Sequence, residues 1–366
     1  MKKTLSVLVA LVVLAVAYLL LWPVPIEPVS MVIPTAPGYV GAYAVNDRLA
    51  HLHVIDLHGE VGPEHIALGP DGKLYTTVAS GNILRMNPDG TEQQVFANTG
   101  GRVLGFDFDA KGNLIAADAV KGLLRIGTDG HATVLTDSFN GAPIRYADAV
   151  VVAKSGKIYF SDASARFAPK DWGGTFEASI LDVIEGSSTG RIIEFDPATG
   201  KSRLVATGLS FANGVALSAD EQSLFVSETG KFRLWKIAVA ANDLNVDQAS
   251  SQASVVLDNL PGYPDNVMRG LDGKIWLGLA KPRNPSVDAM AGKPWLRKLT
   301  LRLPRALWPI PPAYGHVLAI TEDGKVVADL QDPSGAYPET TGITETPGRL
   351  YVQSLHAHGL AWLPKP

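Results

Sequence analysis

The chain has 366 residues, 46% of them apolar, and a formal net charge of −4 at pH 7. Without a broad excess of basic residues to neutralise a phosphate backbone, nucleic acid is excluded as the expected partner. Cysteine is absent, so the sequence excludes disulfide bonds, thiolate metal sites and cysteine nucleophiles. Any chemistry must therefore use oxygen and imidazole groups.

The N-terminal region contains an almost wholly apolar run over residues 4–22, preceded by Lys2 and Lys3. About 20 apolar residues cross a bilayer as a helix, and flanking lysines favour the cytoplasmic side. The small residues at 15–17 leave a cleaved signal peptide as an alternative, but the apolar run continues beyond them. We therefore predict a single-pass membrane anchor over 1–22, with the rest of the chain on the exported side, periplasmic or lumenal.

The next segment, residues 23–45, is rich in proline. Proline fixes the backbone and removes an N–H donor, so this segment cannot build a helix or the interior of a sheet. We predict a stiff, extended linker between the anchor and one folded domain over 46–366. The prolines at its start are Pro23, Pro25, Pro28, Pro34 and Pro37.

One sequence motif then occurs six times. It consists of a polar turn with Asp-Gly or a close equivalent, followed by an apolar, β-rich run. Gly72, Gly112 and Gly156 are 40 and 44 residues apart, which fits the period of a four-stranded blade. Later intervals are longer because of insertions near 166–188 and 281–315. The sequence predicts an all-β fold, a six-bladed β-propeller, because a β-sandwich would not repeat one motif so regularly. The six turns begin at Asp71, Lys111, Ser155, Asp220, Asp272 and Pro347.

Four of the six units carry an acidic or amide side chain at one equivalent position. The innermost strands of a propeller line its channel, so equivalent positions converge on one axis. Carboxylates gathered there repel one another unless a cation is bound. The all-oxygen donor set favours a hard divalent ion, Ca²⁺ before Mg²⁺, over Zn²⁺. Eight residues before the second residue of each turn stand Glu64, Asp148, Asn213 and Asp265 in these units, and Leu104 and Thr340 in the other two.

Asn266 is a fifth candidate, either as a further ligand or as a group that holds Asp265 in place. Asp and Asn at strand starts also cap turns through their own backbone, and we keep that interpretation for turn residues such as Asp71 and Asp272. The predicted metal site consists of Glu64, Asp148, Asn213, Asp265 and Asn266.

The order and spacing of several short stretches give the chain a family resemblance. They cover nearly everything after the linker, at residues 62–64, 104–106, 117–123, 158–162, 190–192, 212–217 and 262–266. On these stretches the sequence resembles the strictosidine synthase-like branch of the gluconolactonase and paraoxonase superfamily, which includes the adipocyte plasma membrane-associated proteins.

The resemblance implies a six-bladed propeller that holds calcium through Glu, Asn, Asn and Asp. Glu64, Asn213 and Asp265 match that set residue by residue. Asp148 departs from it, because members more often have Asn-Asp after an aromatic and a small residue. An aspartate keeps an oxygen ligand and adds negative charge, so we expect it to alter ion affinity more than to abolish it.

Two further departures limit what the resemblance implies about activity. Strictosidine synthases use a glutamate near the axis of the last blade, where this chain has Thr340 and Thr341. Paraoxonases have a histidine where this chain has Leu104. C–N bond-forming chemistry of the strictosidine synthase type is therefore the least favoured reading, since we find no acid or base near Thr341.

The expected function is membrane-anchored, calcium-dependent hydrolysis of a small-molecule lactone or aryl ester. The ion would polarise the carbonyl, and Asp265 is the candidate catalytic base. No G-x-S-x-G elbow is present, so a serine hydrolase has no support. The alternative is a non-catalytic ligand-binding propeller in which the ion is structural.

Histidines and one basic segment complete the predictions. His51, His53, His356 and His358 are expected to face solvent, and His65 to pack behind the channel because it points opposite to Glu64. Residues 295–308 mix bulky apolar and basic side chains. This segment is predicted either to lie on the membrane through Arg297, Lys298 and Arg302, to cover the channel as a lid, or to pack on the propeller with its charges in water.

Overall fold

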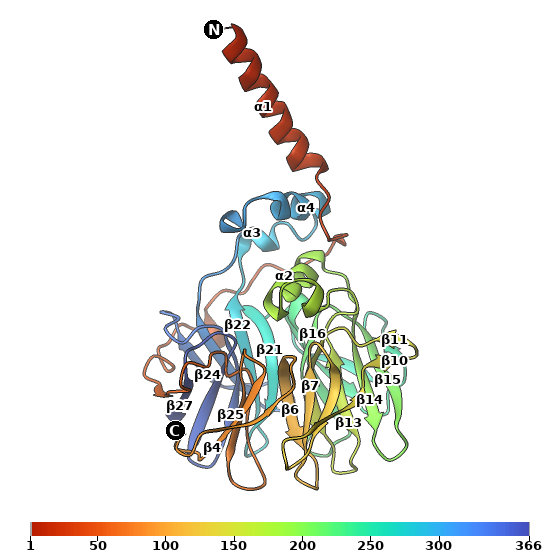
Figure 1. Cartoon of the computed structure of the whole chain (residues 1–366), viewed down its shortest axis with the longest axis vertical. Helices are drawn as coiled ribbons and strands as arrows, with labels where there is room; N and C mark the ends of the chain where they lie inside the picture. The colour runs from red at the N-terminus through yellow and green to blue at the C-terminus, as the bar shows by residue number, and fades with distance from the viewer. Residues whose placement is uncertain (1, 366) are drawn as a thin grey trace.

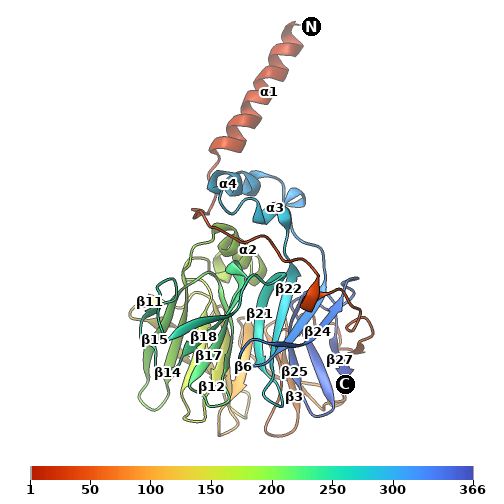
Figure 2. The ribbon, with the colours of Figure 1, turned by 180° about the vertical axis from the view of Figure 1, so that it is seen from behind.

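Six β-sheets surround a central axis in the computed structural model, which describes residues 2–365 (Figures 1 and 2). Each sheet has four antiparallel strands, and one gains a short parallel fifth strand. The predicted six-bladed β-propeller is confirmed. All six predicted turns lie between the first and second strand of a blade, where hydrogen bonds such as that from the Gly72 N–H to the Gly69 carbonyl close them.

The first five blades are made of strands in chain order. Their bounds are β2 (Ile66–Leu68), β3 (Leu74–Thr77), β4 (Asn82–Met86) and β5 (Gln94–Asn98); β6 (Val103–Phe108), β7 (Leu114–Asp118), β8 (Gly122–Ile126) and β9 (Ala132–Thr136); β12 (Ala147–Val152), β13 (Ile158–Asp162), β14 (Gly190–Asp196), β15 (Lys201–Leu209) and the added β19 (Leu244–Asn245); β16 (Ala212–Leu217), β17 (Ser223–Glu228), β18 (Arg233–Ala238) and β20 (Ala253–Leu257); and β21 (Gly262–Arg269), β22 (Ile275–Pro282), β23 (Gly315–Ile320) and β24 (Val326–Asp332).

The sixth blade joins the two ends of the domain. Strands β25 (Thr340–Glu345), β26 (Arg349–Ser354) and β27 (Leu360–Pro364) are completed by β1 (His53–Ile55), which pairs with β27. The N-terminal strand β1 therefore supplies the fourth strand of this blade and closes the ring. Outside the blades, β10 (Ser138–Phe139) and β11 (Ala142–Pro143) form a small hairpin.

The inner strands approach one another very closely beside the channel. At Gly214 in β16, an added Cβ would lie 2.2 Å from the backbone nitrogen of Val267 and 2.6 Å from the carbonyl oxygen of Asp265, both in β21. No side chain larger than hydrogen fits this contact. Gly214 therefore sets the spacing of the fourth and fifth blades next to Asn213 and Asp265.

Both insertions project from the same end of the propeller (Figure 1). The first, between β13 and β14, holds the 3₁₀ turn η2 (Pro169–Asp171) and helix α2 (Thr175–Glu185). The second, between β22 and β23, holds α3 (Pro285–Asp288), α4 (Pro294–Arg302) and η4 (Arg305–Leu307). Helix α2 is tied to the third blade by a 2.9 Å hydrogen bond from the Tyr146 hydroxyl to the Thr175 carbonyl.

The proline-rich segment runs across this end of the molecule, and residues 24–35 are called the strap here. Ile26 is fully buried in the strap. The Val29 N–H donates to the Glu185 carbonyl at the end of α2, and the Met31 N–H donates to the Ala291 carbonyl after α3. Further on, η1 (Gly41–Tyr43) packs against β24. The segment is extended, and it is bound to the propeller along its length.

Helix α1 (Lys2–Leu21) extends away from the propeller at the end that carries α2, α3 and α4 (Figures 1 and 2). Its mean hydropathy of 2.8 and its 20 residues make it long and apolar enough to cross a membrane. None of its side chains is buried.

The basic residues of α4 contact protein, so the prediction that all three face lipid or water is wrong for Arg297. Arg297 is 2% exposed, and its guanidinium donates to the carbonyls of Ile184 and Ala291, among others. Lys298 pairs with Glu27 at 2.8 Å, and Arg302 donates to the Trp22 and Leu19 carbonyls. The physical reason is that the last carbonyls of a helix have no partner within the helix. At the C-terminal ends of α1 and α2, arginine side chains donate hydrogen bonds to these carbonyls.

Replacing Gly214 by alanine tests the close approach of the inner strands. We expect Gly214→Ala to lower the free energy of unfolding by about 1–3 kcal/mol, because the added methyl forces β16 and β21 apart. Gly348→Ala is the matched control, since nothing lies within 4 Å of its added Cβ. Denaturant unfolding measures both, and equal stabilities of the two variants would contradict the packing described.

Asp182 in α2 gives a pH-dependent prediction. Its side chain is fully buried, and burial raises its pKa to about 8. A carboxyl whose pKa is raised in the folded state contributes to the stability of the fold through its protonated form. That contribution is complete below pH ~4 and is lost as the pH rises to 8. Asp182→Asn should therefore gain stability over the parent between pH 5 and 8, by up to about 1.4 kcal/mol per pH unit.

Unfolding curves at several pH values check this gain. The control is Glu177→Gln on the accessible side of the same helix, where Glu177 pairs with Arg305 at the surface. A stability difference between Asp182→Asn and the parent that stays constant with pH would refute the assignment.

Candidate functional site

Four of the predicted metal-site residues meet at the axis of the propeller, at the end covered by α2. Glu64 precedes β2, Asp148 lies in β12, Asn213 in β16 and Asp265 in β21, and all four line one small cavity. Each is buried, with exposed fractions between 2% and 7%. Leu104 lines the same cavity, so the second blade contributes an apolar side chain where four others contribute oxygen.

The three carboxyl groups are held in an unfavourable electrostatic environment. Burial, followed by the nearby charge of Asp265, raises the pKa of Glu64 and of Asp148 well above the usual range. Burial raises the pKa of Asp265 to about 7. The guanidinium of Arg102 partly offsets the rise in the pKa of Glu64. One guanidinium does not balance three carboxylates.

Two oxygens of the site have no hydrogen-bond donor. They are Oε2 of Glu64 and Oδ1 of Asn213, and both are buried. Buried acceptors without a donor are rare in folded proteins and point to a missing partner, such as water or an ion. The orphaned oxygens come from different blades and face the same cavity, so one cation could satisfy both.

Asn266 lies beside this cavity rather than in its lining. Its Nδ2 donates to the Glu64 carbonyl at 3.1 Å, to Oε1 of Glu64 at 3.2 Å and to Oε1 of Gln353 at 3.2 Å. The Thr341 hydroxyl also donates to the Glu64 carbonyl, at 3.3 Å. These contacts fix the backbone and side chain of Glu64.

The carboxylates alone do not make a metal-binding group. Within residues 2–365, no three Asp, Glu, His or Cys side chains are grouped so that they could hold a metal. The ligand set predicted from the sequence combines these carboxyl groups with the amide oxygen of Asn213, and it remains a prediction. Such a mixed set of carboxylate and amide oxygens is the donor chemistry that Ca²⁺ accepts.

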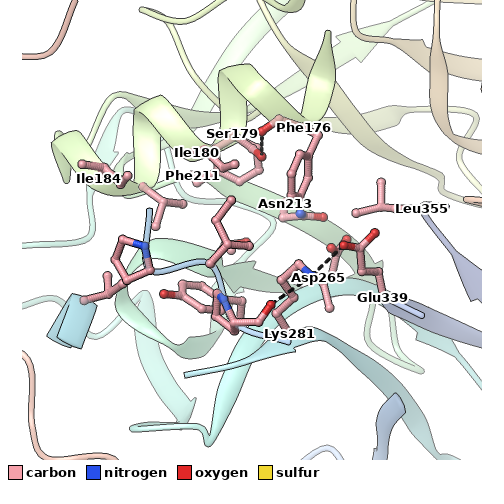
Figure 3. A pocket seen from close by; sticks show the side chains of 18 residues that line it. Phe176, Ser179, Ile180, Ile184, Phe211, Asn213, Asp265, Lys281, Glu339 and Leu355 are labelled. Carbon is pink, nitrogen blue, oxygen red and sulfur yellow. Dashed lines mark hydrogen bonds and ion pairs between the residues drawn. The ribbon is translucent and has the colours of Figure 1, made fainter. Parts of the chain in front are cut away.

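A larger, mostly apolar pocket adjoins the oxygen cluster at Asn213 and Asp265 (Figure 3). It shares Phe176, Ser179, Phe211, Asn213, Asp265 and Leu355 with the small cavity. One wall is the inner face of α2, and another is the segment 309–311 that follows η4. Asp265 and Asn213 thus lie where the oxygen-lined floor meets an apolar chamber, which is a common form of small-molecule site.

A charged cluster in the pocket wall escaped the sequence analysis. Glu339 accepts hydrogen bonds from Lys281, at 2.7 Å, and from Nδ1 of His356. Glu339 stands two positions before Thr341, where no acid or base was expected, and it lines the pocket. The sequence signal that could have indicated Glu339 was its position directly before Thr340, which lies at the axial position of its blade. His356 is exposed as predicted, yet it is paired with an acid.

The prediction for His53 agrees with the structure, and the prediction for His65 does not. His65 is 5% exposed and packs on Phe106 with ring centroids 4.7 Å apart, but it lines a cavity between the inner strands of five blades instead of lying behind the channel. Burial lowers its pKa to about 4, so it remains neutral at physiological pH. His53 is exposed and stacks on Trp362.

Two family models match this chain. Residues 41–86 match "Strictosidine synthase-like, N-terminal" and residues 148–242 match "Strictosidine synthase". Among solved structures, a gluconolactonase from Xanthomonas campestris superposes with a TM-score of 0.59, at 19% identity, over 94% of this chain and 99% of that one. The calcium-binding protein regucalcin from Agrobacterium tumefaciens superposes with a TM-score of 0.57, at 16% identity, over 85% and 92%. At these identities the likeness shows the shared propeller fold.

Relatives found by sequence have a higher identity to this chain than these solved structures do. Protein strictosidine synthase-like 10 of Arabidopsis thaliana is 31% identical over 331 residues, which are 82% of this chain and 85% of the relative. The adipocyte plasma membrane-associated protein of Salmo salar is 30% identical over 361 residues, 91% of this chain and 82% of the relative. With such identity over most of both lengths, and with the six blades and axial cavity in place, this chain belongs to the strictosidine synthase-like family.

Proposed function

We propose that this protein is a membrane-anchored, calcium-dependent hydrolase of lactones or aryl esters. The observation that carries the proposal is the junction of two cavities at Asp265 and Asn213, where buried oxygens form the floor of an apolar pocket. The lactone class is supported by the gluconolactonase among the structural neighbours, and calcium by regucalcin.

The proposed calcium ligands are Glu64, Asp148, Asn213 and Asp265. The two orphaned oxygens and the repulsion among the three carboxyls would both be relieved by a divalent cation. Asn266 supports the set through its hydrogen bond to Glu64. An oxygen-only set in a cysteine-free chain favours Ca²⁺ over Zn²⁺.

Bound calcium would supply the positive charge that polarises the carbonyl oxygen of a lactone or ester. The side chains provide the rest. Phe176, Ile180 and Phe211 line the apolar chamber and exclude water around the substrate's hydrocarbon part. The Asp265 carboxylate, which faces both cavities, is the proposed base that takes the proton of an attacking water.

The anchor places this chemistry at a membrane. Helix α1 leaves the same end of the molecule as the helices that roof the pocket (Figure 2). Lys2 and Lys3 at its start favour a cytoplasmic N-terminus, so we propose that the propeller lies on the exported side.

Calcium binding can be measured without any substrate. The full-length chain in detergent should unfold at a higher temperature with calcium than with chelator, because the ion binds only the folded site. Glu64→Gln and Asp148→Asn should each remove most of that increase. Asp107→Asn is the control, an inner-strand carboxylate outside the cavity that accepts from the Val152 N–H. Equal calcium stabilisation in all variants would exclude this ligand set.

Hydrolysis is tested on phenyl acetate and simple lactones. We expect turnover that chelator removes and calcium restores, and a loss of at least about 10²-fold in kcat/KM for Asp265→Asn. Calcium stabilisation with background rates on every ester and lactone would instead favour a non-catalytic binding propeller with a structural ion.

A further inference from the structure

A charged cluster at the wall of the apolar pocket consists of three residues, Lys281, Glu339 and His356. Lys281 lies near the end of β22 in the fifth blade. Glu339 precedes β25 and His356 follows β26 of the sixth blade. Lys281 and Glu339 line the pocket together with Asp265 (Figure 3). The charge of Glu339 is close enough to act on Asp265.

Hydrogen bonding decides what each member of the cluster can do. Oε1 of Glu339 accepts from Lys281 and Oε2 accepts from Nδ1 of His356. Although burial opposes it, these hydrogen bonds hold the pKa of Glu339 below its usual range. Glu339 is therefore ionised, and each of its carboxylate oxygens already accepts a hydrogen bond. This makes Glu339 a positioning group rather than a proton donor.

The imidazole of His356 is oriented from two sides. Glu339 fixes Nδ1, and the ring packs edge-on against Phe176 at 5.4 Å and 89°. Phe176 and Glu339 both line the pocket, and the exposed His356 ring contacts both of them from its rim. With Nδ1 bonded to the Glu339 carboxylate, Nε2 is the ring nitrogen left free to act on another group.

We propose that His356 is the general acid of the hydrolysis, with Glu339 and Lys281 as the residues that position it. This assignment rests on the proposed function. Water adds to the carbonyl carbon and gives its proton to Asp265. The bond from the carbonyl carbon to the ring or ester oxygen breaks, and Nε2–H of His356 protonates that oxygen. Asp265 and His356 then exchange one proton through solvent, which restores both.

The assignment also defines which substrates need His356. A phenol leaves readily as its anion, because its pKa is about 10. An aliphatic alkoxide is far more basic and needs a proton as the bond breaks. His356 therefore extends the enzyme from aryl esters to aliphatic lactones, which deepens the proposed substrate class.

The test compares two six-membered lactones that differ in the leaving oxygen, dihydrocoumarin with a phenolic oxygen and δ-valerolactone with an aliphatic one. In the full-length chain, His356→Gln should lower kcat/KM for δ-valerolactone by at least about 10²-fold and leave dihydrocoumarin near the parent rate. The ratio of the two rates should change with pH in the parent and be flat in His356→Gln. The charged groups facing His356 are Glu339 and, beyond it, Lys281.

Controls separate this role from folding. His358→Gln alters an exposed histidine of the same loop and should leave both rates unchanged. Thermal unfolding and calcium stabilisation of His356→Gln should match the parent. Equal loss on both lactones, or no loss on either, overturns the assignment of His356 while the hydrolase proposal stands. A parent protein inactive on both lactones and on phenyl acetate overturns the hydrolase proposal and this assignment with it.

Discussion

Three carboxyl groups buried on one axis are the constraint on which the rest of this structure depends. Glu64, Asp148 and Asp265 come from the first, third and fifth blades, and each is almost without solvent contact. Ionised carboxylates in such a space repel one another and lose hydration, and Arg102 offsets only part of that. The fold must therefore hold these groups by its frame, through close contacts such as Gly214 against Val267 and through the hydrogen bonds of Asn266.

The helices at the same end convert this polar channel mouth into an enclosed pocket. Helix α2 is fixed by Tyr146 at its start and by the strap at its end. Arg297 joins the end of α2, the strap and the segment after α3 through backbone carbonyls. The pocket roof and the polypeptide leading to helix α1 are thus one packed unit.

Family membership and site chemistry are separate questions here, because one fold supports many activities. The chain has the propeller and relatives of the strictosidine synthase-like family, yet Thr341 and Leu104 stand where the two best-known activities of the wider group would need a glutamate and a histidine. An acidic group is present nevertheless in the pocket wall, in Glu339, and it is paired with the imidazole of His356. Both residues lie in loops at the channel mouth rather than in the blades.

The sequence by itself determined the blades and the axial oxygens. A repeated turn motif sets a common register, and a common register places Glu64, Asp148, Asn213 and Asp265 at one level of the channel. Only the tertiary structure decided the pairing of Lys281, Glu339 and His356, the burial of Arg297 and the docking of the strap. These features lie in insertions and loops without a repeat, where partners distant in the chain are chosen by packing and by unsatisfied carbonyls rather than by any local pattern.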